Sequence, residues 1–308
     1  SKKEIKKAQD KAIRGGYGNN GKGSKWRGGW NQEYADNFNK IFGKNKGENK
    51  QNVYIFDVDG TLTPSRRKIS PEFKKFFIKW ALSNKFYLVT GSDLQKTREQ
   101  LPLEIMSKAQ GIYCCCGNEY YVPSSFNGQT PTVGQEEPVF FDRRYGSEFE
   151  VPEDLTDYLL KELETSSYPK RCGNHLEKRN GMLNFSIVGR NCNLNDRKDF
   201  FEWDNKFTKR DRVAAYIRKH WPNIDASLGG QISIDIYPKG KDKSQVLDKI
   251  IADCPGAKYV FVADRAYPGG NDYPLAEVME ERDYEFNDCE VKQVDSWEDT
   301  LKYLKTHQ

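Results

Sequence analysis

The sequence lacks any apolar run long enough to cross a membrane as a helix. Such a helix needs about 18 or more consecutive apolar residues. Here the mean hydropathy over 308 residues is -0.86, and 31% of the residues are charged. The basic start, residues 1–7, is not followed by an apolar segment, so we expect no secretory signal. These features predict a cytoplasmic protein that makes no membrane contact.

Metal-binding cysteine patterns are also missing. None of the seven cysteines forms a Cys-x-x-Cys pair, and the three histidines (His175, His220 and His307) lie far in sequence from the consecutive cysteines at 114–116. These spacings argue against a zinc site. Neighbouring residues of a strand point to opposite faces, so consecutive cysteines cannot pair neatly with one another. We interpret them as small core residues in a reducing compartment.

Charge is distributed unevenly along the chain. Residues 1–52 carry 13 Lys and Arg against 5 Asp and Glu, a net charge of +8, and the rest carry 36 against 40, a net charge of -4. The first segment is also rich in Gly and Asn, a composition that buries too little apolar surface to offset chain entropy. We therefore expect a mobile basic arm, with a short amphipathic helix at residues 31–42. Its interleaved aromatic residues would suit single-stranded nucleic acid, although a solvated tail is the favoured interpretation.

After the arm, segments with strand and helix patterns alternate. Apolar runs predict strands at residues 53–56, 86–89, 111–116 and 259–263. Helices are expected at residues 71–83, 94–101, 244–252 and 274–280. Residues 119–123, followed by Asn127-Gly128, suggest a hairpin. The alternation indicates an α/β fold with a Rossmann-like, mainly parallel sheet.

The middle of the chain has a different pattern. Helical segments at residues 152–165, 195–202 and 210–220 accompany strand-like runs at residues 182–188 and 231–237. Helices with antiparallel strands suggest an inserted α+β domain, residues 147–237. It would sit on top of a core made of residues 53–146 and 238–308. Ligands bind at the carboxyl ends of the strands in parallel sheets of this kind.

Two aspartates follow the first predicted strand. Asp57 and Asp59 stand in the run Phe56-Asp57-Val58-Asp59-Gly60-Thr61, where Gly60 and Thr61 turn the chain. A capped turn would need only one Asp, and a calcium loop would need further oxygen ligands and a late Glu. The pattern therefore favours phosphoryl transfer, with Asp57 attacking phosphorus and Asp59 giving and taking the proton.

Three further clusters lie at predicted strand ends or helix starts. Thr90 and Ser92 could bond a phosphoryl oxygen, although Thr-Gly-Ser is also an ordinary helix cap. Lys243 opens a helix, against the dipole preference, which an anionic ligand would explain; a solvated lysine is the alternative. Asp264 and Asp272 supply further hard oxygen ligands. Together with Asp57 and Asp59 they would suit Mg²⁺, which takes few carboxylates and keeps several waters.

The order of these clusters resembles the haloacid dehalogenase superfamily, phosphotransferases with a Rossmann-like core and a cap. Longer runs are similar to eukaryotic-type phosphomannomutases and span residues 53 to about 305. They are Phe56-Asp57-Val58-Asp59-Gly60-Thr61-Leu62-Thr63, Arg179-Asn180-Gly181-Met182-Leu183-Asn184, Gly189-Arg190-Asn191-Cys192, Gly229-Gly230-Gln231-Ile232-Ser233-Ile234-Asp235 and Pro268-Gly269-Gly270-Asn271-Asp272. The resemblance implies a mutase that isomerises a hexose phosphate through an aspartyl-phosphate and a bisphosphate. It also implies a homodimer formed through the cap.

The resemblance further implies which residues hold the substrate. Cap arginines would bind the non-reacting phosphate, Arg66 would join them from the core side, and other cap residues would contact the sugar. The residues so implied are Arg66, Arg179, Arg190, Arg197, Ser233 and Asp235. Guanidinium forks suit phosphate bidentately, in agreement with this assignment.

Several positions depart from the family pattern. Cys172 stands where the family carries another clamp arginine, and whether its neighbour Arg171 takes that role stays open. The family's Gly-Gly-Ser-Asp is Thr90-Gly91-Ser92-Asp93, and the loop at residues 237–243 is unusually basic. A phosphatase on the same fold is therefore an alternative to the mutase. A non-enzymatic binding protein that works through its basic arm is a second alternative.

Overall fold

The computed structural model describes residues 50–124 and 140–307. Asn49–Gln308 forms one compact unit, separate from Ser1–Glu48. The expected helix at residues 31–42 and the hairpin turn Asn127-Gly128 lie outside the described residues. Among the residues described, no helix is long and apolar enough to cross a membrane.

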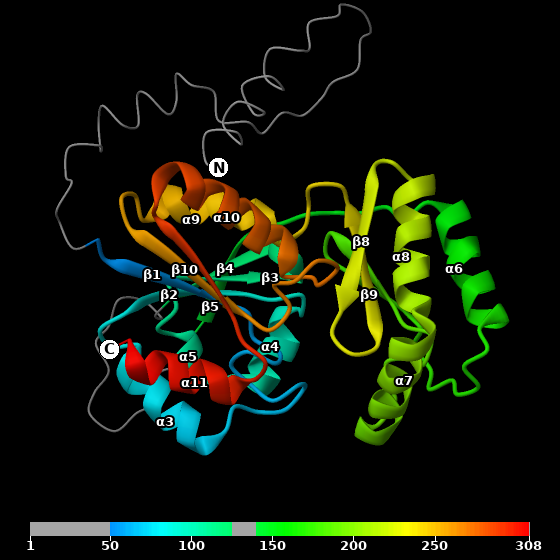
Figure 1. Ribbon diagram of the computed structural model, residues 1–308, viewed down its shortest axis with the longest axis horizontal. Helices are drawn as coiled ribbons and strands as arrows, with labels where there is room; N and C mark the ends of the chain where they lie inside the picture. The colour runs from blue at the N-terminus through cyan, green and yellow to red at the C-terminus, as the bar shows by residue number, and fades with distance from the viewer. Residues whose placement is uncertain (1–49, 125–139, 308) are drawn as a thin grey trace, which may run out of the picture. The chain divides into compact units, whose positions relative to one another are not determined.

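A seven-stranded sheet in the order β11-β10-β1-β2-β3-β4-β5 organises the first layer (Figure 1). The strands from β11 to β3 run parallel, whereas β4 and β5 join antiparallel. Their bounds are β1 Asn52–Phe56, β2 Lys85–Val89, β3 Gly111–Cys114, β4 Glu119–Ser124, β5 Phe140–Gly146, β10 Lys258–Ala263 and β11 Cys289–Gln293. The prediction of an α/β fold with a mainly parallel sheet is confirmed.

Helices cover both faces of this sheet (Figure 1). On one face, α3, α5 and α11 pack against β1 and its neighbours; on the other, α9 and α10 do so. In α3 the buried Phe73, Phe77 and Trp80 recur at helical spacing, and the Ser70 hydroxyl accepts from the Phe73 N–H at 3.2 Å. The bounds are α3 Pro71–Trp80, α4 Leu94–Gln100, α5 Leu103–Met106, α9 Leu247–Asp253, α10 Tyr273–Phe286 and α11 Trp297–Thr306.

A second, antiparallel sheet in the order β6-β7-β9-β8 is covered by three helices. Side chains alternate along its strands: Leu183 and Ile234 enter the apolar core beneath the helices, whereas Asn184 and Asp235 lie on the opposite face. The second face therefore carries the polar groups. The bounds are β6 Leu176–Arg179, β7 Met182–Phe185, β8 Ile224–Gly229, β9 Ser233–Pro238, α6 Glu153–Thr165, α7 Leu194–Phe207 and α8 Lys209–His220.

Some predicted boundaries are wrong. The strand expected at residues 111–116 ends at Cys114, because Cys115 and Cys116 adopt positive φ angles of 50° and 57° and turn the chain. The strand expected at residues 182–188 ends at Phe185. The helix expected from Ser244 begins with a 3₁₀ turn, Lys243–Val246. All three cysteines at 114–116 are buried, as expected of core residues.

Candidate active site

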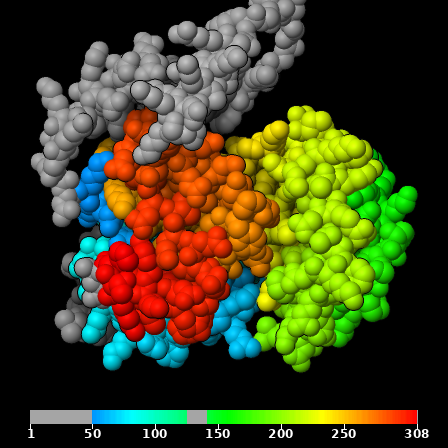
Figure 2. All heavy atoms as spheres, viewed as in Figure 1, coloured from blue at the N-terminus to red at the C-terminus, as the bar shows by residue number. Residues whose placement is uncertain are grey.

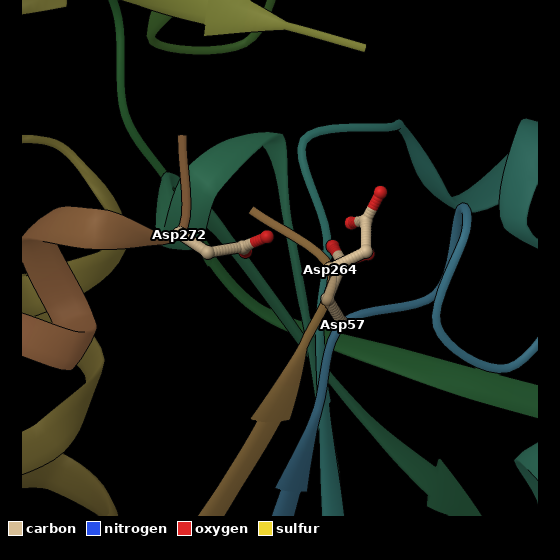
Figure 3. A group of neighbouring side chains, drawn as sticks. All are labelled: Asp57, Asp264 and Asp272. Carbon is tan, nitrogen blue, oxygen red and sulfur yellow. The ribbon is translucent and has the colours of Figure 1, made fainter. Parts of the chain in front are cut away.

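Three carboxylates meet at the carboxyl edge of the parallel sheet. Asp57 follows β1, Asp264 follows β10, and Asp272 precedes α10. One oxygen of each lies within 4.8 Å of the others, and in Figure 3 the Asp272 side chain points toward the other two. Adjacent parallel strands end side by side, so two strand-end aspartates become neighbours although about 200 residues separate them.

A buried lysine lies behind these carboxylates. Lys243 is 0% exposed, and its Nζ donates to Asp57 at 2.6 Å and to Asp272 at 2.5 Å. Burial alone would lower the pKa of Lys243, but Asp272 and Asp57 outweigh that effect and raise it. Lys243 is therefore a fixed positive charge against the predicted nucleophile. A helix-start lysine with two carboxylate partners is not the solvated lysine of the alternative interpretation.

The turn after Asp57 brings the backbone against this cluster. Gly60 has a φ of +104°, and a Cβ atom there would lie 2.5 Å from Asp264 Oδ2. Thr61 supports the same contact, because its Oγ1 accepts from the Asp264 N–H at 3.0 Å. Gly and Thr at these positions are thus explained by the close approach of β1 and β10.

The Asp59 carboxylate lies outside the three-carboxylate cluster. It accepts hydrogen bonds from Gln100 Nε2 at 2.7 Å and from the backbone N–H of Arg66. It also lines the pocket that Asp57 and Asp264 line. Of the four predicted metal ligands, the structure thus brings three carboxylates together and holds the fourth to one side.

The predicted hydroxyl groups border the same pocket. Thr90 follows β2 and is buried, and its Oγ1 accepts from the Ser92 N–H at 3.1 Å. Asp93 caps α4 by accepting from the Lys96 N–H at 2.8 Å. In this run Asp93 caps the helix, whereas Thr90, Gly91 and Ser92 line the pocket.

Four arginines converge on the pocket from the other side. Arg66, Arg179, Arg190 and Arg197 all line it, together with Asp235. Ser233 lies behind them and accepts from Arg190 Nη1 at 2.6 Å. Burial lowers the pKa of Arg190 to about 10, with Arg66 and Arg179 adding to that effect, which leaves it cationic at neutral pH.

Some guanidinium nitrogens of this cluster lack partners. Arg179 Nη2, Arg197 Nε and Arg197 Nη1 are buried and have no hydrogen-bond acceptor among the described residues. Buried donors are almost always paired, because an unpaired one costs about 1–3 kcal/mol. Three such donors on two cations beside one pocket fit an anion that would accept from them.

Arg171 does not replace the arginine missing at Cys172. Its guanidinium donates to backbone carbonyls of Leu163, Ser166, Tyr168 and Lys170. Those carbonyls lie around the end of α6, and Arg171 does not line the pocket. Cys172 Sγ instead lies 3.8 Å from Asp196 Oδ2. The question that the sequence leaves open is thereby answered in the negative.

The sequence did not assign roles to several residues at the site. Asn184 donates to Asp235 Oδ1 at 2.5 Å, Gln100 holds Asp59, and Asn271 lines the pocket. Asn184 and Asn271 stand inside the motif runs, which was a usable signal. Gln100 lies at the end of α4, where nothing in the sequence connects it with Asp59.

The pocket has a volume of about 50 Å³ and adjoins a cavity of about 480 Å³. Both share Asp59, Arg66 and Ser92. Small-molecule sites usually measure about 300–1,000 Å³, so only the larger space is of that size.

The segment before α10 contacts the antiparallel sheet. In Figure 2 the orange segment that carries α10 abuts the yellow segment near β8, and the Leu228 N–H donates to the Gly269 carbonyl at 3.3 Å between these segments.

The carboxylate cluster fits a hard divalent cation. Burial raises the pKa of Asp57 to about 7, against the attraction of Lys243, and burial with Asp57 and Asp272 raises the pKa of Asp264 well above its usual range. Asp264 Oδ1 is buried and has no hydrogen-bond partner among the described residues. Crowded carboxylates with a free oxygen can hold a metal ion that removes their mutual repulsion.

Comparison with known proteins agrees with the family resemblance of the sequence motifs. The model of the eukaryotic phosphomannomutase family matches residues 73–306. A phosphomannomutase of Saccharomyces cerevisiae is 35% identical over 235 residues, which cover 74% of this chain and 86% of that protein. One from Dendrobium officinale is 32% identical over 257 residues, 83% of this chain and 93% of that protein.

Solved structures agree on the fold. An IMP-nucleotidase of Plasmodium falciparum superposes with a TM-score of 0.53 at 12% identity, covering 89% of this chain and 78% of that one. This likeness concerns the fold alone. The sequence matches are closer and span most of the chain, and they confirm the resemblance drawn from the motifs. The chain therefore belongs to the eukaryotic phosphomannomutase family of enzymes.

Proposed function

We propose that this enzyme interconverts hexose 1-phosphates and 6-phosphates, mannose 1-phosphate being the substrate to test first. One observation carries the proposal: a single pocket has a strand-end carboxylate on one side and unpaired arginine donors on the other. A hexose bisphosphate has two phosphates, and this pocket together with the adjoining cavity of about 480 Å³ offers a place for each. The names of the curated relatives support mannose as the sugar.

The reaction is two phosphoryl transfers through Asp57. With a phosphoryl group on Asp57, a sugar hydroxyl attacks phosphorus, the bond to the carboxylate breaks, and Asp59 takes the hydroxyl proton. The bisphosphate then turns end for end. Asp57 attacks the other phosphate, and Asp59 returns the proton to the sugar oxygen as it leaves. Lys243 keeps Asp57 oriented throughout through the hydrogen bond described above.

The remaining residues bind and orient the substrate. Arg66, Arg179, Arg190 and Arg197 would hold the non-reacting phosphate, which suits their forked donors. Asp235 would accept from sugar hydroxyls, with Ser233 behind it. Thr90 and Ser92 would border the reacting phosphoryl group.

Mg²⁺ is the metal we assign to Asp57, Asp264 and Asp272. When bound, it offsets the repulsion between these carboxylates and the phosphate anion. We assign Asp59 the acid and base role rather than a place among the carboxylate ligands, since Gln100 holds its side chain apart from the cluster.

The domain division belongs to the same proposal. Residues 147–237 would be a substrate-binding cap, and residues 53–146 and 238–308 the catalytic core. A homodimer through the cap is the assembly that the family resemblance implies, and the cap residue Tyr216, 42% exposed, is a surface position at which to test it. Sedimentation of the wild type against a Tyr216→Asp variant tests it; a monomeric wild type would reject it.

Product analysis tests the reaction. The chain is incubated with mannose 1-phosphate and Mg²⁺, with and without a catalytic amount of hexose 1,6-bisphosphate, and followed by ³¹P NMR. We expect mannose 6-phosphate, formed faster with the bisphosphate. Release of inorganic phosphate alone would identify a phosphatase instead, and no product of either kind would favour a binding protein.

A further inference from the structure

Glu177, on β6, holds three cations at once. Its Oε1 accepts from Arg179 Nε at 2.8 Å and from Lys96 Nζ, and its Oε2 accepts from Arg190 Nε at 3.1 Å. Glu177 does not line the pocket, whereas Arg179 and Arg190 do. Any effect of this carboxylate on the substrate must therefore pass through the arginines.

The charges explain why a carboxylate is needed there. The side chains of Arg179 and Arg190 are 5% and 7% exposed, so water screens their mutual repulsion poorly. Burial would raise the pKa of Glu177, but Arg179, Lys96 and Arg190 outweigh it and lower this pKa to about 2. Glu177 is therefore a permanent negative charge between them at any physiological pH.

Two of the three guanidinium nitrogens of Arg179 are hydrogen-bonded within the described part of the protein, and the third is free to bind a ligand. Arg179 uses Nε on Glu177 and Nη1 on the Gly91 carbonyl at 2.7 Å, so only Nη2 lacks a partner. Arg190 is fixed similarly, by Glu177 at Nε and by Ser233 at Nη1. A planar guanidinium with two nitrogens bound cannot rotate, so its remaining donor is aimed in advance.

The third cation joins the two sheets. Lys96 belongs to α4, which follows β2 of the seven-stranded sheet, whereas Glu177 belongs to the antiparallel sheet. Lys96 also lines the cavity of about 480 Å³. Its ion pair with Glu177 thus lies between that cavity and the arginines and links the two sheets there.

We infer that Glu177 is a positioning residue, which aims Arg179 and Arg190 at the non-reacting phosphate and, through Lys96, ties the cap to the core when the pocket is closed. This inference rests on the proposed phosphate site. It adds a residue outside the pocket to the determinants of affinity. It also makes Lys96 the point at which closure of the cap is coupled to the arginine cluster.

Two variants test it, each with a matched control. Glu177→Gln removes the charge but keeps the shape; Glu162→Gln makes the same change in the Glu162–Lys209 pair of the cap, where the carboxylate side chain is 21% exposed against 17% for Glu177. Lys96→Met removes the core partner, with Lys209→Met as its control. Folding of each is checked by thermal unfolding, and mannose 1-phosphate binding by calorimetry in Mg²⁺.

We expect Glu177→Gln to raise Kd and KM for mannose 1-phosphate about ten-fold or more. The reason is that misplaced arginines would lose charge-assisted hydrogen bonds to the phosphate. The activity ratio of mannose 1-phosphate to acetyl phosphate, which has no distal phosphate, should fall by the same factor. Lys96→Met should weaken binding less, and adding it to Glu177→Gln should change little, because Lys96 acts through Glu177.

The outcomes separate this inference from the proposed function. If the wild type does not bind mannose 1-phosphate, the proposed function fails. If the wild type binds and Glu177→Gln binds equally well, the positioning role is rejected. The role is also rejected if Glu162→Gln loses as much, or if the substrate ratio stays constant. Full additivity of the two variants would reject the coupling through Lys96.

Discussion

Lys243 is the residue on which the buried charges of the site depend. It is the cation that Asp57 and Asp272 share, and the two carboxylate side chains are only 6% and 0% exposed. Removing one partner of a buried ion pair typically costs about 3–5 kcal/mol, because the remaining charge stays desolvated. Here two carboxylates, Asp57 and Asp272, would be left without that cation.

Lys243→Met should therefore lower the free energy of unfolding by about 3–5 kcal/mol in EDTA. Mg²⁺ should restore part of the loss, because a ligand of the folded state stabilises it by mass action. Thermal unfolding in EDTA and in Mg²⁺ measures both effects. Lys258→Met is the control, since its pair with Glu290 is 40% and 35% exposed and should contribute about 0–1 kcal/mol. Equal losses in the two variants would contradict the assigned role.

Asp59 can be separated from Asp57 by the choice of leaving group. An aryl phosphate leaves as a stable anion and needs little protonation, whereas a sugar alkoxide needs a proton from Asp59. Asp59→Asn should slow the transfer of a phosphoryl group to Asp57 from a hexose bisphosphate far more than from an aryl phosphate. Single-turnover rates at saturating Mg²⁺ provide the measurement, and Asp142→Asn, distant from the site in sequence and exposed, is the control. A similar loss on both substrates would show that Asp59 is not the acid.

At the scale of elements, the turn between β7 and α7 places Arg190. Gly189 has a φ of +90°, and a Cβ atom there would lie 2.3 Å from the Gly173 carbonyl oxygen and 2.8 Å from the Cys172 carbonyl carbon. Both obstacles are backbone atoms, so neither can rotate away. The backbone can therefore adopt this turn only because residue 189 has no side chain.

Gly189→Ala should cost about 1–3 kcal/mol from backbone strain and clash, and it should displace Arg190. We expect weaker binding of mannose 1-phosphate together with lower stability. Gly256→Ala is the matched control, because Gly256 also has a positive φ, +77°, but nothing within 4 Å of its Cβ position. It should lose stability through strain alone and bind normally. If both variants bind alike, the turn does not position Arg190.

Elements with strong apolar patterns were predictable from sequence, whereas polar ones were not. The strands β1, β2 and β10 are buried on both faces and read as apolar runs. The sequence of β6 is Leu-Glu-Lys-Arg, which has no apolar run, because Glu177 and Arg179 belong to the charged cluster beside the pocket. β11 lies at the edge of its sheet and has only a weak apolar pattern. Both were missed, as was α11. The turn at Cys115 and Cys116 was missed because non-glycine residues rarely adopt positive φ.

The same distinction applies to the site. Motif residues such as Asp57, Arg179 and Asp264 could be found because strand ends and family runs mark them. Glu177 and Gln100 could not, since their importance comes from contacts between segments that are 81 and 41 residues apart in sequence. Which cation a carboxylate will hold depends on tertiary packing, and local sequence does not encode it.

At the scale of the whole molecule, positive charge is concentrated in the first segment of the chain. Ser1–Glu48 forms a unit distinct from Asn49–Gln308, and residues 1–52 carry a net charge of +8. Deleting residues 1–48 should leave kcat and KM for mannose 1-phosphate nearly unchanged. Steady-state kinetics of the two forms is the measurement, and a large loss of activity in the shorter chain would contradict an arm that stands outside catalysis.

A nucleic-acid role for this segment would have its own signature. Full-length protein would bind single-stranded RNA or DNA at low salt, with log affinity falling steeply as salt rises, and the shorter chain would not bind. Absence of binding at low salt supports the favoured interpretation of a solvated tail.

The central claim is that Asp57 carries the phosphoryl group. The most direct measurement mixes the protein with Mg²⁺ and hexose 1,6-bisphosphate, quenches in acid within one turnover, and maps the phosphoryl group by mass spectrometry of peptides. The account predicts one phosphoryl group on the peptide that contains Asp57, and none in an Asp57→Asn variant that folds normally. A phosphoryl group on any other residue, or labelling that persists in Asp57→Asn, would contradict it.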